Sequence, residues 1–454
     1  MSMYEYFEAG VRGGMTFVNK HHAVKDAETE LCYLDVNNLY GVPLSGKLPC
    51  RGFEWVKGEP DTLLKLCDNL PNEEADFGYV LEVDLHIPYA EHERLADLPP
   101  APRSEKPPGS KSNKLLLTLE DKEHYIVHSA LLKFYIEELR VRVLRVHRAV
   151  KFQQDYIFRN YINSNTEKRA RSTTKFHKDY YKLMNNSLYG KTVKNLRKRK
   201  DVRLCNQATK FVSYVSRPLF KRAMQIDDNL SAAFMMKDTV VLDRPVYIGQ
   251  AVLDISKLRM YRLQYADLEK YRIRHPEGSI SILAGDTDSF FLAVKNISLA
   301  NVLYPEMIND GLLDTSNYHH QSRLYNPQFE NKIGLVKDES GGKADYIEWI
   351  FLRPKCYSML CSGDIGNCHR AKGIQRRTDL THTDYTHIYN SYNPYALDPP
   401  DTHTVTQRSI ISRTHQLYTV ERSKIALSIM DDKRMWIAKN DSLPYGYRGR
   451  VYTL

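Results

Sequence analysis

Three aspartates have the residue type and spacing that a two-metal phosphoryl-transfer site requires. Asp35 lies near the end of an apolar run at residues 30–36, and Asp286 and Asp288 are two residues apart between two apolar segments. Carboxylates that converge where they are partly buried repel one another unless cations lie between them. Two divalent ions ~3.5–4 Å apart stabilise the attacking and leaving oxygens of such a reaction. The sequence therefore predicts that these aspartates bind two Mg²⁺ ions, or Mn²⁺ in their place. The competing interpretation of Asp286 and Asp288 is a plain surface turn.

A basic stripe is the second feature that could take part in chemistry. Arg171, Lys175, Lys178 and Lys182 follow the i, i+4, i+7, i+11 spacing that places side chains on one face of a helix. Like charges on one stripe repel, and a bound triphosphate would offset that repulsion. The alternative is a solvated helix face. Residues 186–190 follow directly, and their small and polar side chains suit a contact with a base pair.

The elements that must position these residues are a mixture of strands and helices. Apolar runs and alternation predict strands, and apolar residues every three or four positions predict helices. The strands are 30–36, 78–87 and the hairpin 280–294, and the helices are 165–189, 249–265 and 421–430. Val252, Ile255 and Leu258 form the expected inner face of the helix at 249–265, and residues 98–112 form an expected exposed loop. Strands and helices do not alternate regularly, which favours the α+β class.

The positive charge of the chain is concentrated around the basic stripe. The 454 residues include 65 Lys and Arg and 55 Asp and Glu, a net charge of +10. Residues 168–203 alone contain 13 Lys and Arg against two Asp, a net charge of +11, so the other 418 residues sum to −1. Such a local excess favours a polyanionic partner.

The overall composition is that of an intracellular globular protein. Hydrophobic residues make up 42% and charged residues 26%. No apolar run approaches the ~18–20 residues of a membrane helix, so no membrane partner is expected. The first residues carry acids and glycines and lack the apolar core of a secretory signal. The seven scattered cysteines are expected to be reduced thiols. We therefore expect a protein that is not secreted, and that is nuclear if its host is eukaryotic.

Five short motifs, in this order, resemble those of the family-B DNA polymerases. Arg12–Gly14 resembles the Y-x-G-G linker, and Asp35–Tyr40 resembles the first motif of the family. Lys182–Gly190 matches every defining position of K-x-x-x-N-S-x-Y-G. Asp286–Ser289 resembles Y-x-D-T-D-S, and Lys355–Tyr357 resembles K-x-Y. The long interval between the motif at Asp35–Tyr40 and the motif at Lys182–Gly190 resembles that of the protein-primed branch, which occurs in viruses, virus-like elements and transposable elements.

The sequence departs from the family pattern in two ways. Ala284 and Val11 stand where the family has tyrosine, Asn38 where it has serine, and Gly41 where it has proline. These changes leave the metal ligands in place and affect the positioning of the primer end. Only ten residues precede Val11, so we expect the upstream proofreading exonuclease of the family to be missing. Glu82 and Asp84 lie downstream of Asp35, in the wrong order to replace it.

The resemblance implies a role for each matched residue. Asp35 and Asp288 are expected to bind both metal ions, with the Val36 carbonyl as a further ligand and Asp286 as a catalytic carboxylate that binds transiently. The residues expected to bind the incoming dNTP are Leu39, Tyr40, Arg171, Lys178, Lys182 and Asn186. Tyr40 would also exclude a 2′-hydroxyl, the group that distinguishes RNA from DNA precursors. The residues expected to contact DNA are Gly13, Gly14, Tyr189, Gly190, Lys355 and Tyr357.

The resemblance also implies a right-hand fold with palm, fingers, thumb and two insertions. The expected boundaries are a linker remnant at 1–27, palm at 28–60 and 240–360, an insertion of the terminal-protein type at 61–149, fingers at 150–195, a second insertion at 196–239 and a thumb at 361–454. The implied activity is that of a DNA-directed DNA polymerase in DNA replication. Its implied partners are template–primer DNA, dNTPs and a terminal priming protein.

Three other interpretations stay open at this point. A catalytically decayed, transposon-derived protein would bind DNA without extending it. An RNA-templated polymerase is less favoured, because such enzymes have adjacent aspartates at the third motif, and Thr287 separates them here. A zinc site is the third interpretation, although its residues lack the paired C-x₂-C spacing of common sites. Its residues are Cys356, Cys361, Cys368 and His369.

Overall fold

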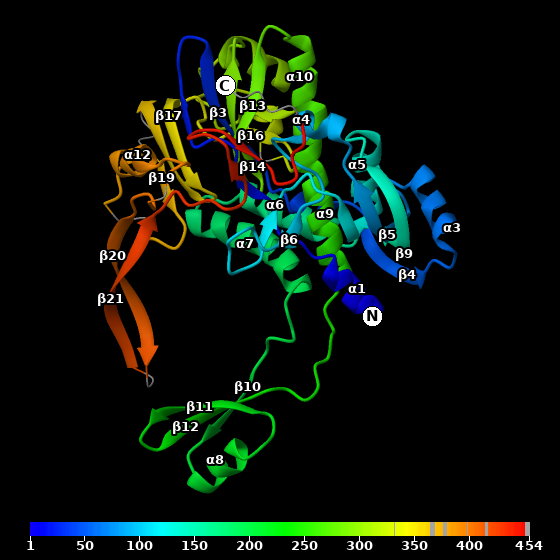
Figure 1. Ribbon diagram of the computed structural model, residues 1–454, viewed down its shortest axis with the longest axis vertical. Coiled ribbons are helices and arrows are strands. Elements are labelled where there is room, and N and C mark those ends of the chain that lie inside the picture. Colours follow the sequence, from blue (N-terminus) through cyan, green and yellow to red (C-terminus); the bar gives the residue numbers. More distant parts are fainter. Residues whose placement is uncertain (331, 364–367, 376–378, 397, 414–415, 450–454) are drawn as a thin grey trace.

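A six-stranded sheet carries the three predicted aspartates in the computed structural model (Figure 1). The structure describes residues 1–330, 332–363, 368–375, 379–396, 398–413 and 416–449. The strand order is β1 (Thr16–Val18), β13 (Ser279–Asp286), β14 (Ser289–Lys295), β3 (Thr29–Val36), β16 (Val336–Asp338) and β15 (Leu313–Asp314). All neighbours pair antiparallel except β15 and β16. The predicted strand at 30–36 and the hairpin at 280–294 are confirmed.

A long helix packs against this sheet and buries its apolar side. Helix α9 (Val246–Arg262) continues through the π-helical turn η3 (Leu263–Asp267) into α10 (Leu268–Arg274). Val252, Ile255 and Leu258 are buried, which confirms the predicted inner face. Leu258 shares one core with Phe290 of β14 and with the neighbouring strands. Burial of apolar surface therefore fixes the sheet and the helix relative to each other.

Two four-stranded sheets flank the first one. One has the order β4 (Leu48–Trp55), β9 (Arg142–Asp155), β5 (Phe77–His86) and β8 (Lys122–His128), and it packs with α1 (Met3–Ala9) and α5 (Ser129–Glu137). The other has the order β19 (Cys368–Ala371), β18 (Cys356–Gly363), β17 (Ala344–Arg353) and β2 (His22–Val24), and α12 (His382–Ser391) packs on it. Strand β5 confirms the strand predicted at 78–87.

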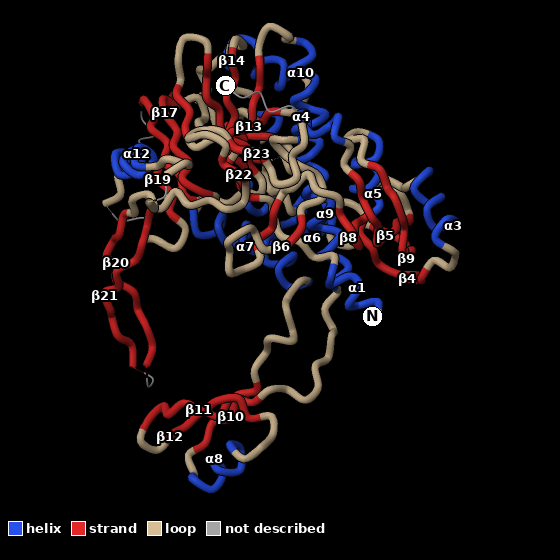
Figure 2. Tube along the Cα trace, viewed as in Figure 1, coloured by secondary structure: helices blue, strands red, loops and turns tan. Residues whose placement is uncertain are grey.

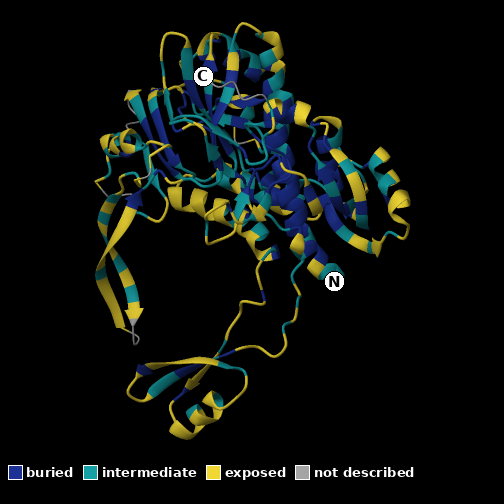
Figure 3. Cartoon of the chain, in the orientation of Figure 1, coloured by how far each residue is buried: buried dark blue, intermediate teal, exposed yellow. Residues whose placement is uncertain are grey.

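Three exposed parts complete the fold, of which the second and the third project from this body (Figure 2). The first is the helix pair α6 (Arg159–Ala170) and α7 (Lys175–Thr192). The second is a small module of β10 (Asp201–Cys205), α8 (Ala208–Val215), β11 (Phe220–Asp227) and β12 (Leu230–Met235), which two loop segments join to the body. The third is the two-stranded ribbon of β20 (His403–Arg413) and β21 (Gln416–Leu427). All three are largely exposed, in contrast to the buried strands of the body (Figure 3).

The remaining elements are short. They are α2 (Gly41–Ser45), α3 (Pro60–Leu64), η1 (Lys65–Asn69), η2 (Tyr89–Glu91), α4 (His92–Leu95), β6 (Arg103–Glu105), β7 (Lys114–Leu116), η4 (Leu299–Leu303), α11 (Tyr304–Asn309), η5 (Pro327–Phe329), β22 (Met435–Trp436) and β23 (Ser442–Leu443). Among the described residues, no helix combines the length and the apolar character needed to cross a membrane.

The structure corrects three sequence-based predictions of local structure. The helix predicted at 165–189 is two helices, because Thr174 caps α7 by accepting a hydrogen bond from the His177 amide. The helix predicted at 421–430 is mostly strand β21, which forms because residues 403–413 supply a pairing partner. The loop at 98–112 is only partly exposed, since Leu98 and Ala101 are fully buried.

Candidate active site

The pairing of β3 with β14 brings Asp35 and Asp288 side by side. Asp35 lies opposite Ser289 in the register, and Asp288 immediately precedes Ser289. The Val36 amide donates a hydrogen bond of 2.8 Å to the Asp288 carbonyl, which fixes the two segments to each other. Leu34 and Val36 on either side of Asp35 are buried, whereas Asp35 itself is half-buried. Strand alternation therefore directs the Asp35 carboxylate away from the apolar core.

The pKa values of Asp35 and Asp288 are both raised, by burial and by nearby negative charge, and a bound cation would relieve both effects. Burial, followed by the negative charges of Asp288 and Glu339, raises the pKa of Asp35 to about 8. Burial also raises the pKa of Asp288 to about 6, and the charge of Asp286 adds to this. Lys182 opposes both shifts. The ionised forms are thus penalised in the protein alone, and a bound cation would favour them.

The donor set near these aspartates suits Mg²⁺ only if other ligands contribute. Among the described residues, no three His, Cys, Asp or Glu side chains converge closely enough to enclose a metal ion. Asp35 and Asp288 supply hard carboxylate oxygens, and the charge of Glu339 reaches Asp35. Mg²⁺ usually keeps several waters and takes only one or two carboxylates beside substrate phosphates. The residues present therefore fit Mg²⁺ or Mn²⁺ bound together with a phosphate-bearing ligand.

Asp286 is paired with a cation, and its negative charge also reaches Asp288. Its Oδ1 lies 2.7 Å from Nζ of Lys355, so the third and the K-x-Y motifs meet in one ion pair. Gly14 packs against the same turn, where a Cβ atom would lie 2.5 Å from Cγ2 of Thr287. The Thr287 amide also donates to the Met15 carbonyl at 2.7 Å. The absence of a side chain at Gly14 therefore lets the segment before β1 pack against the turn at Thr287. A Cβ atom on Gly13, by contrast, would meet nothing within 4 Å.

A cavity of about 230 Å³ opens above Asp35 and Asp288. Six predicted residues line it, namely Asp35, Leu39, Tyr40, Lys182, Asn186 and Asp288. Arg171 and Lys178, predicted from the same stripe, do not line it. Arg171 ends α6 instead of lying on α7, because the helix breaks after it. Val36 does not line the cavity, because its side chain is buried in the core, and its amide donates to the Asp288 carbonyl.

Sequence reasoning did not assign Asn37, Asn38 or Thr166 to this cavity, and it missed four further residues with charged or polar side chains. They are Arg169, Asn185, Lys337 and Glu339. Lys337 pairs with Asp35 across β16 and β3, nearly 300 residues apart in the chain. No local sequence pattern predicts the pairing of these two strands. Arg169 could have been found by ending the first helix before the Ser172-Thr173-Thr174 run, which is typical of a helix N-terminus.

The first and second motifs meet in a pair of stacked rings. Tyr40 and Tyr189 lie with ring centroids 4.7 Å apart and planes inclined by 11°. Burial, together with the neighbouring Tyr189, raises the pKa of Tyr40. Helix α7 is held in place by α6, where Nδ2 of Asn165 donates to Oδ1 of Asn185 at 2.9 Å. The tyrosine pair closes one wall of the cavity floored by the aspartates.

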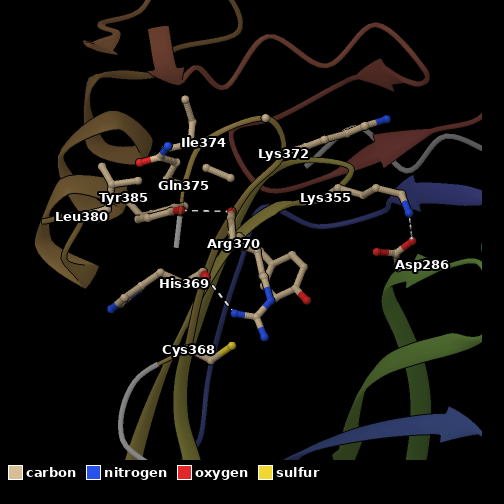
Figure 4. Close-up of a pocket in the computed structure, with 13 residues that line it drawn as sticks. Asp286, Lys355, Cys368, His369, Arg370, Lys372, Ile374, Gln375, Leu380 and Tyr385 are labelled. Carbon is tan, nitrogen blue, oxygen red and sulfur yellow. Dashed lines mark hydrogen bonds and ion pairs between the residues drawn. The ribbon is translucent and has the colours of Figure 1, made fainter. Parts of the chain in front are cut away.

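A second cavity, of about 760 Å³, lies beside Asp286 (Figure 4). Its wall includes the cations Lys355, Arg370 and Lys372, together with Tyr357 and His369. Tyr357 and Arg370 are cross-strand partners in β18 and β19. The cavity thus joins the K-x-Y motif to a cationic surface, which suits an anionic strand. Cys361 and Cys368 lie on the same two strands as part of the sheet.

A chain of hydrogen bonds supports this second cavity from behind. Oγ of Ser358 lies 2.8 Å from Nδ1 of His369 and 2.7 Å from Nδ1 of His382. Nε2 of His382 lies 3.1 Å from Oε2 of Glu348, whose other oxygen lies 2.7 Å from Nε2 of His22. The chain joins the first residue of α12 to strands β2, β17, β18 and β19. It therefore fixes the wall that carries His369.

Glu82 and Asp84 have structural partners of their own. Glu82 pairs with His124 at 2.8 Å and with Arg148 at 2.6 Å, and Asp84 pairs with His147 at 2.8 Å. These ion pairs neutralise the two carboxylates, which lie two residues apart on β5. They lie on the sheet that flanks the aspartate-bearing one.

Comparisons with known proteins agree with this geometry. The model of the family described as "DNA polymerase type B, organellar and viral" matches residues 1–266. The sequence matches no curated protein. Phi29 DNA polymerase in complex with primer–template DNA and incoming nucleotide is similar in fold, with a TM-score of 0.58 and 15% identity over 94% of this chain. Phi29 DNA polymerase with single-stranded DNA gives a TM-score of 0.57 and 13% identity over the same share. This chain spans 63% of the length of those polymerases.

Proposed function

The chain belongs to the organellar and viral type B DNA polymerases, and we propose from this premise that it is a DNA-directed DNA polymerase that adds dNTPs to a primer end. The observation that carries the proposal is the meeting of Asp35 and Asp288 beneath a cavity lined by Lys182, Tyr40 and Asn186. Segments far apart in the sequence supply the carboxylates, and the exposed helix α7 supplies the cation (Figure 3). This is the division of charge that phosphoryl transfer needs.

The carboxylate side of the cavity would hold the metal ions. We assign Asp35 and Asp288 as their ligands, with the Val36 carbonyl and Glu339 nearby. Bound divalent ions would neutralise charge at the attacking and leaving oxygens. Asp286 would act through Lys355, because their ion pair of 2.7 Å would hold the lysine in place for contact with the primer end. Mg²⁺ is the favoured ion, and Mn²⁺ has the same preference for oxygen ligands.

The cation side of the cavity would hold the triphosphate. Lys182 and Arg169 both line the cavity, and Lys337 lies opposite Asp35 in the neighbouring strand. Fixed positive charges stabilise the developing negative charge without reorganising during the reaction. Asn186 would contact the same nucleotide. Tyr40, held by its stack with Tyr189, would pack under the sugar and exclude a 2′-hydroxyl.

The wider fold supports an assignment of parts, which we also propose. The aspartate-bearing sheet with α9 would be the palm (28–60 and 240–360), and α6 with α7 the fingers (150–195). The β20–β21 ribbon would belong to the thumb (361–454). Residues 61–149, which supply β5, β8 and part of β9 in the flanking sheet, and the module at 196–239 would be the two insertions, the first of them facing a priming protein if one is used. Lys355 and Tyr357 would contact the primer strand in the larger cavity.

A substitution at one aspartate tests the proposal directly. Asp288→Ala should reduce Mg²⁺-dependent extension of a primer–template by ~10³-fold or more, because it removes a metal ligand that acts in the transition state. Binding of the same DNA should persist, as measured by fluorescence anisotropy. Asp228→Ala, in the exposed turn between β11 and β12, is the matched control and should extend normally.

Two results would contradict the proposal. Extension by Asp288→Ala at the normal rate would remove that residue from the reaction. DNA binding without any extension by the unaltered protein, with Mg²⁺ or Mn²⁺, would instead support a decayed protein that only binds DNA.

A further inference from the structure

A short segment before β1 holds the turn between β13 and β14. Thr287, in the middle of this turn, has a φ of 66°, a left-handed conformation that a β-branched residue rarely adopts. Such a conformation persists only where the surrounding structure holds it. The Thr287 amide donates to the Met15 carbonyl at 2.7 Å, and Thr16 then pairs with Asp286 as β1 begins. We call residues 12–16 the supporting segment.

A buried lysine of α9 anchors the start of the supporting segment. Lys257 is 3% exposed, and its Nζ donates to the Arg12 carbonyl at 2.8 Å. Nζ also donates to the Leu253 carbonyl at 3.2 Å and lies 3.9 Å from Oδ1 of Asp254. Leu253 and Asp254 belong to α9 itself. The hydrogen bond to Arg12 is therefore what joins this lysine to another part of the chain.

A lysine in this position is costly, because its charge is taken out of water. Burial lowers the pKa of Lys257 to about 8, and the charge of Asp254 opposes that shift. Oδ2 of Asp254 accepts in turn from the His128 amide at 3.0 Å and from Nε2 of Gln250 at 2.7 Å. An apolar pair of similar volume would often pack such a helix equally well. The ion pair is therefore better explained by the hydrogen bond to Arg12 than by its contribution to stability.

The side chain of Arg12 anchors the same residue to the flanking sheet. Its Nη1 donates to the Ile126 carbonyl at 2.6 Å, and its guanidinium carbon lies 3.9 Å from the centroid of the Tyr125 ring. Strand β8 and helix α9 thus fix Arg12 together. Met15, which accepts from the Thr287 amide, follows only three residues later. A displacement of Arg12 would therefore reach the turn.

Lys257 lines neither of the two cavities and lies outside the five motifs that resemble the family. We propose that Lys257 is a positioning residue, which holds the supporting segment against the turn through Arg12 and so sets where Asp286 and Asp288 lie for the reaction. The effect on the reaction rests on the proposed polymerase function, whereas the effect on the turn does not.

The test uses the full chain with Lys257→Met, which keeps the apolar stem and removes the charge and the hydrogen bonds. Hydrogen–deuterium exchange of the amides at 286–288 should become about tenfold faster or more, while peptides from β3 should exchange as before. In steady-state extension, kcat should fall by about tenfold or more, because the aspartates are displaced. The KM for dNTPs should change by less than about twofold, because residues of α6 and α7 would bind the triphosphate.

Lys122→Met is the matched control. Lys122 is also buried, at 1% exposure, and its Nζ donates to the carbonyls of Thr118 and Glu120 in the loop before β8. Its loss should lower overall stability and leave both kcat and exchange at the turn unchanged. A second variant, Asp254→Asn/Lys257→Met, keeps the test possible if Lys257→Met does not fold, because it leaves neither charge of the pair unpaired. It should show the same two effects.

Three results would overturn the proposal. The first is unchanged exchange at the turn in the Lys257 variants. The second is an equal increase in exchange in Lys122→Met, which would reduce the effect to overall stability. The third is a normal kcat in a Lys257 variant whose turn exchanges faster.

Extension by the unaltered protein is scored separately. Faster exchange at the turn in Lys257→Met, with no extension by the unaltered protein, would contradict the polymerase proposal and leave the support of the turn standing. Normal extension by the unaltered protein, with an unchanged turn in the variant, would do the reverse.

Discussion

The two sides of the nucleotide cavity are built in different ways. Asp35 lies on β3 and Asp288 immediately precedes β14, its pairing partner, and the strand residues Leu34, Val36 and Phe290 are at most 1% exposed. Lys182 lies on α7, where Asn185 and Thr192 are the buried residues among those described. The difference follows from the sign of the charges. Carboxylates that repel must be forced together by a packed framework, whereas cations that attract an anionic ligand need only be within its reach.

The largest effect should be on stability, when the same phenylalanine-to-alanine substitution is made on each side of the cavity. Phe290→Ala removes a ring that is 1% exposed beneath the aspartates, and it should lower the free energy of unfolding by ~3–5 kcal/mol. Phe176→Ala removes a ring that is 73% exposed, and it should change that free energy by less than about 0.5 kcal/mol. Urea denaturation followed by circular dichroism measures both. Similar shifts in the two midpoints would show that α7 is part of the packed framework.

The next effect concerns the repulsion between Asp35 and its neighbouring carboxylates, which makes the stability of the protein depend on pH. The folded protein raises the pKa of Asp35 to about 8, above its value in an unfolded chain, so the folded state holds the proton more tightly. Stability from this group is therefore present at low pH and is lost as the pH rises from about 4 through 8. Asp35→Asn should flatten that part of the pH profile of the melting temperature, and Mg²⁺ should raise the melting temperature of the unaltered protein near pH 8.

The control for this pH experiment is a carboxylate with the opposite shift. The pKa of Asp76 is lowered by its hydrogen bond and ion pair with Lys47, so Asp76→Asn should leave the decline toward pH 8 in place. An unchanged decline in Asp35→Asn would mean that other groups cause it.

The smallest effect should separate two arginines two residues apart. Arg169 lines the cavity, whereas Arg171 ends α6 outside it. Arg169→Ala should raise the KM for dNTPs by about tenfold, as expected for loss of one charged hydrogen bond, while Arg171→Ala should change it by less than about twofold. Steady-state extension kinetics measure both. A larger effect at Arg171 would restore the single basic stripe predicted from the sequence.

The packed side of the cavity could be predicted from the sequence because its signals are local. Apolar runs marked β3 and the β13–β14 hairpin, and a carboxylate within each run marked Asp35 and Asp288. Glu339 and Lys337 could not be predicted in this way. They reach the site only because β16 pairs with β3, and that pairing depends on the whole sheet.

The exposed side of the cavity, formed by α6 and α7, was predicted less well because periodicity alone says little about exposed helices. The spacing from Arg171 to Lys182 fits one helix, yet Thr174 caps a new one and turns Arg171 away. Likewise, residues 421–425 are all exposed and so show no alternation of buried and exposed side chains that would indicate a strand, and pairing with β20 makes them one. Where burial does not select the conformation, caps and long-range partners do.

The hydrogen-bond chain behind the larger cavity has a fixed direction. Glu348 can only accept, so Nε2 of His382 carries the proton that faces it, and in the neutral ring Nδ1 accepts. With His382 in that neutral form, Ser358 donates its single hydroxyl hydrogen to His382, and its oxygen receives the Nδ1 proton of His369. Burial lowers the pKa of His369 and keeps that ring neutral. Nε2 of His369 is left as a hydrogen-bond acceptor in a wall whose cations, Lys355, Arg370 and Lys372, are all donors. A carboxylate on a distant strand thus sets the tautomer of a histidine in the cavity.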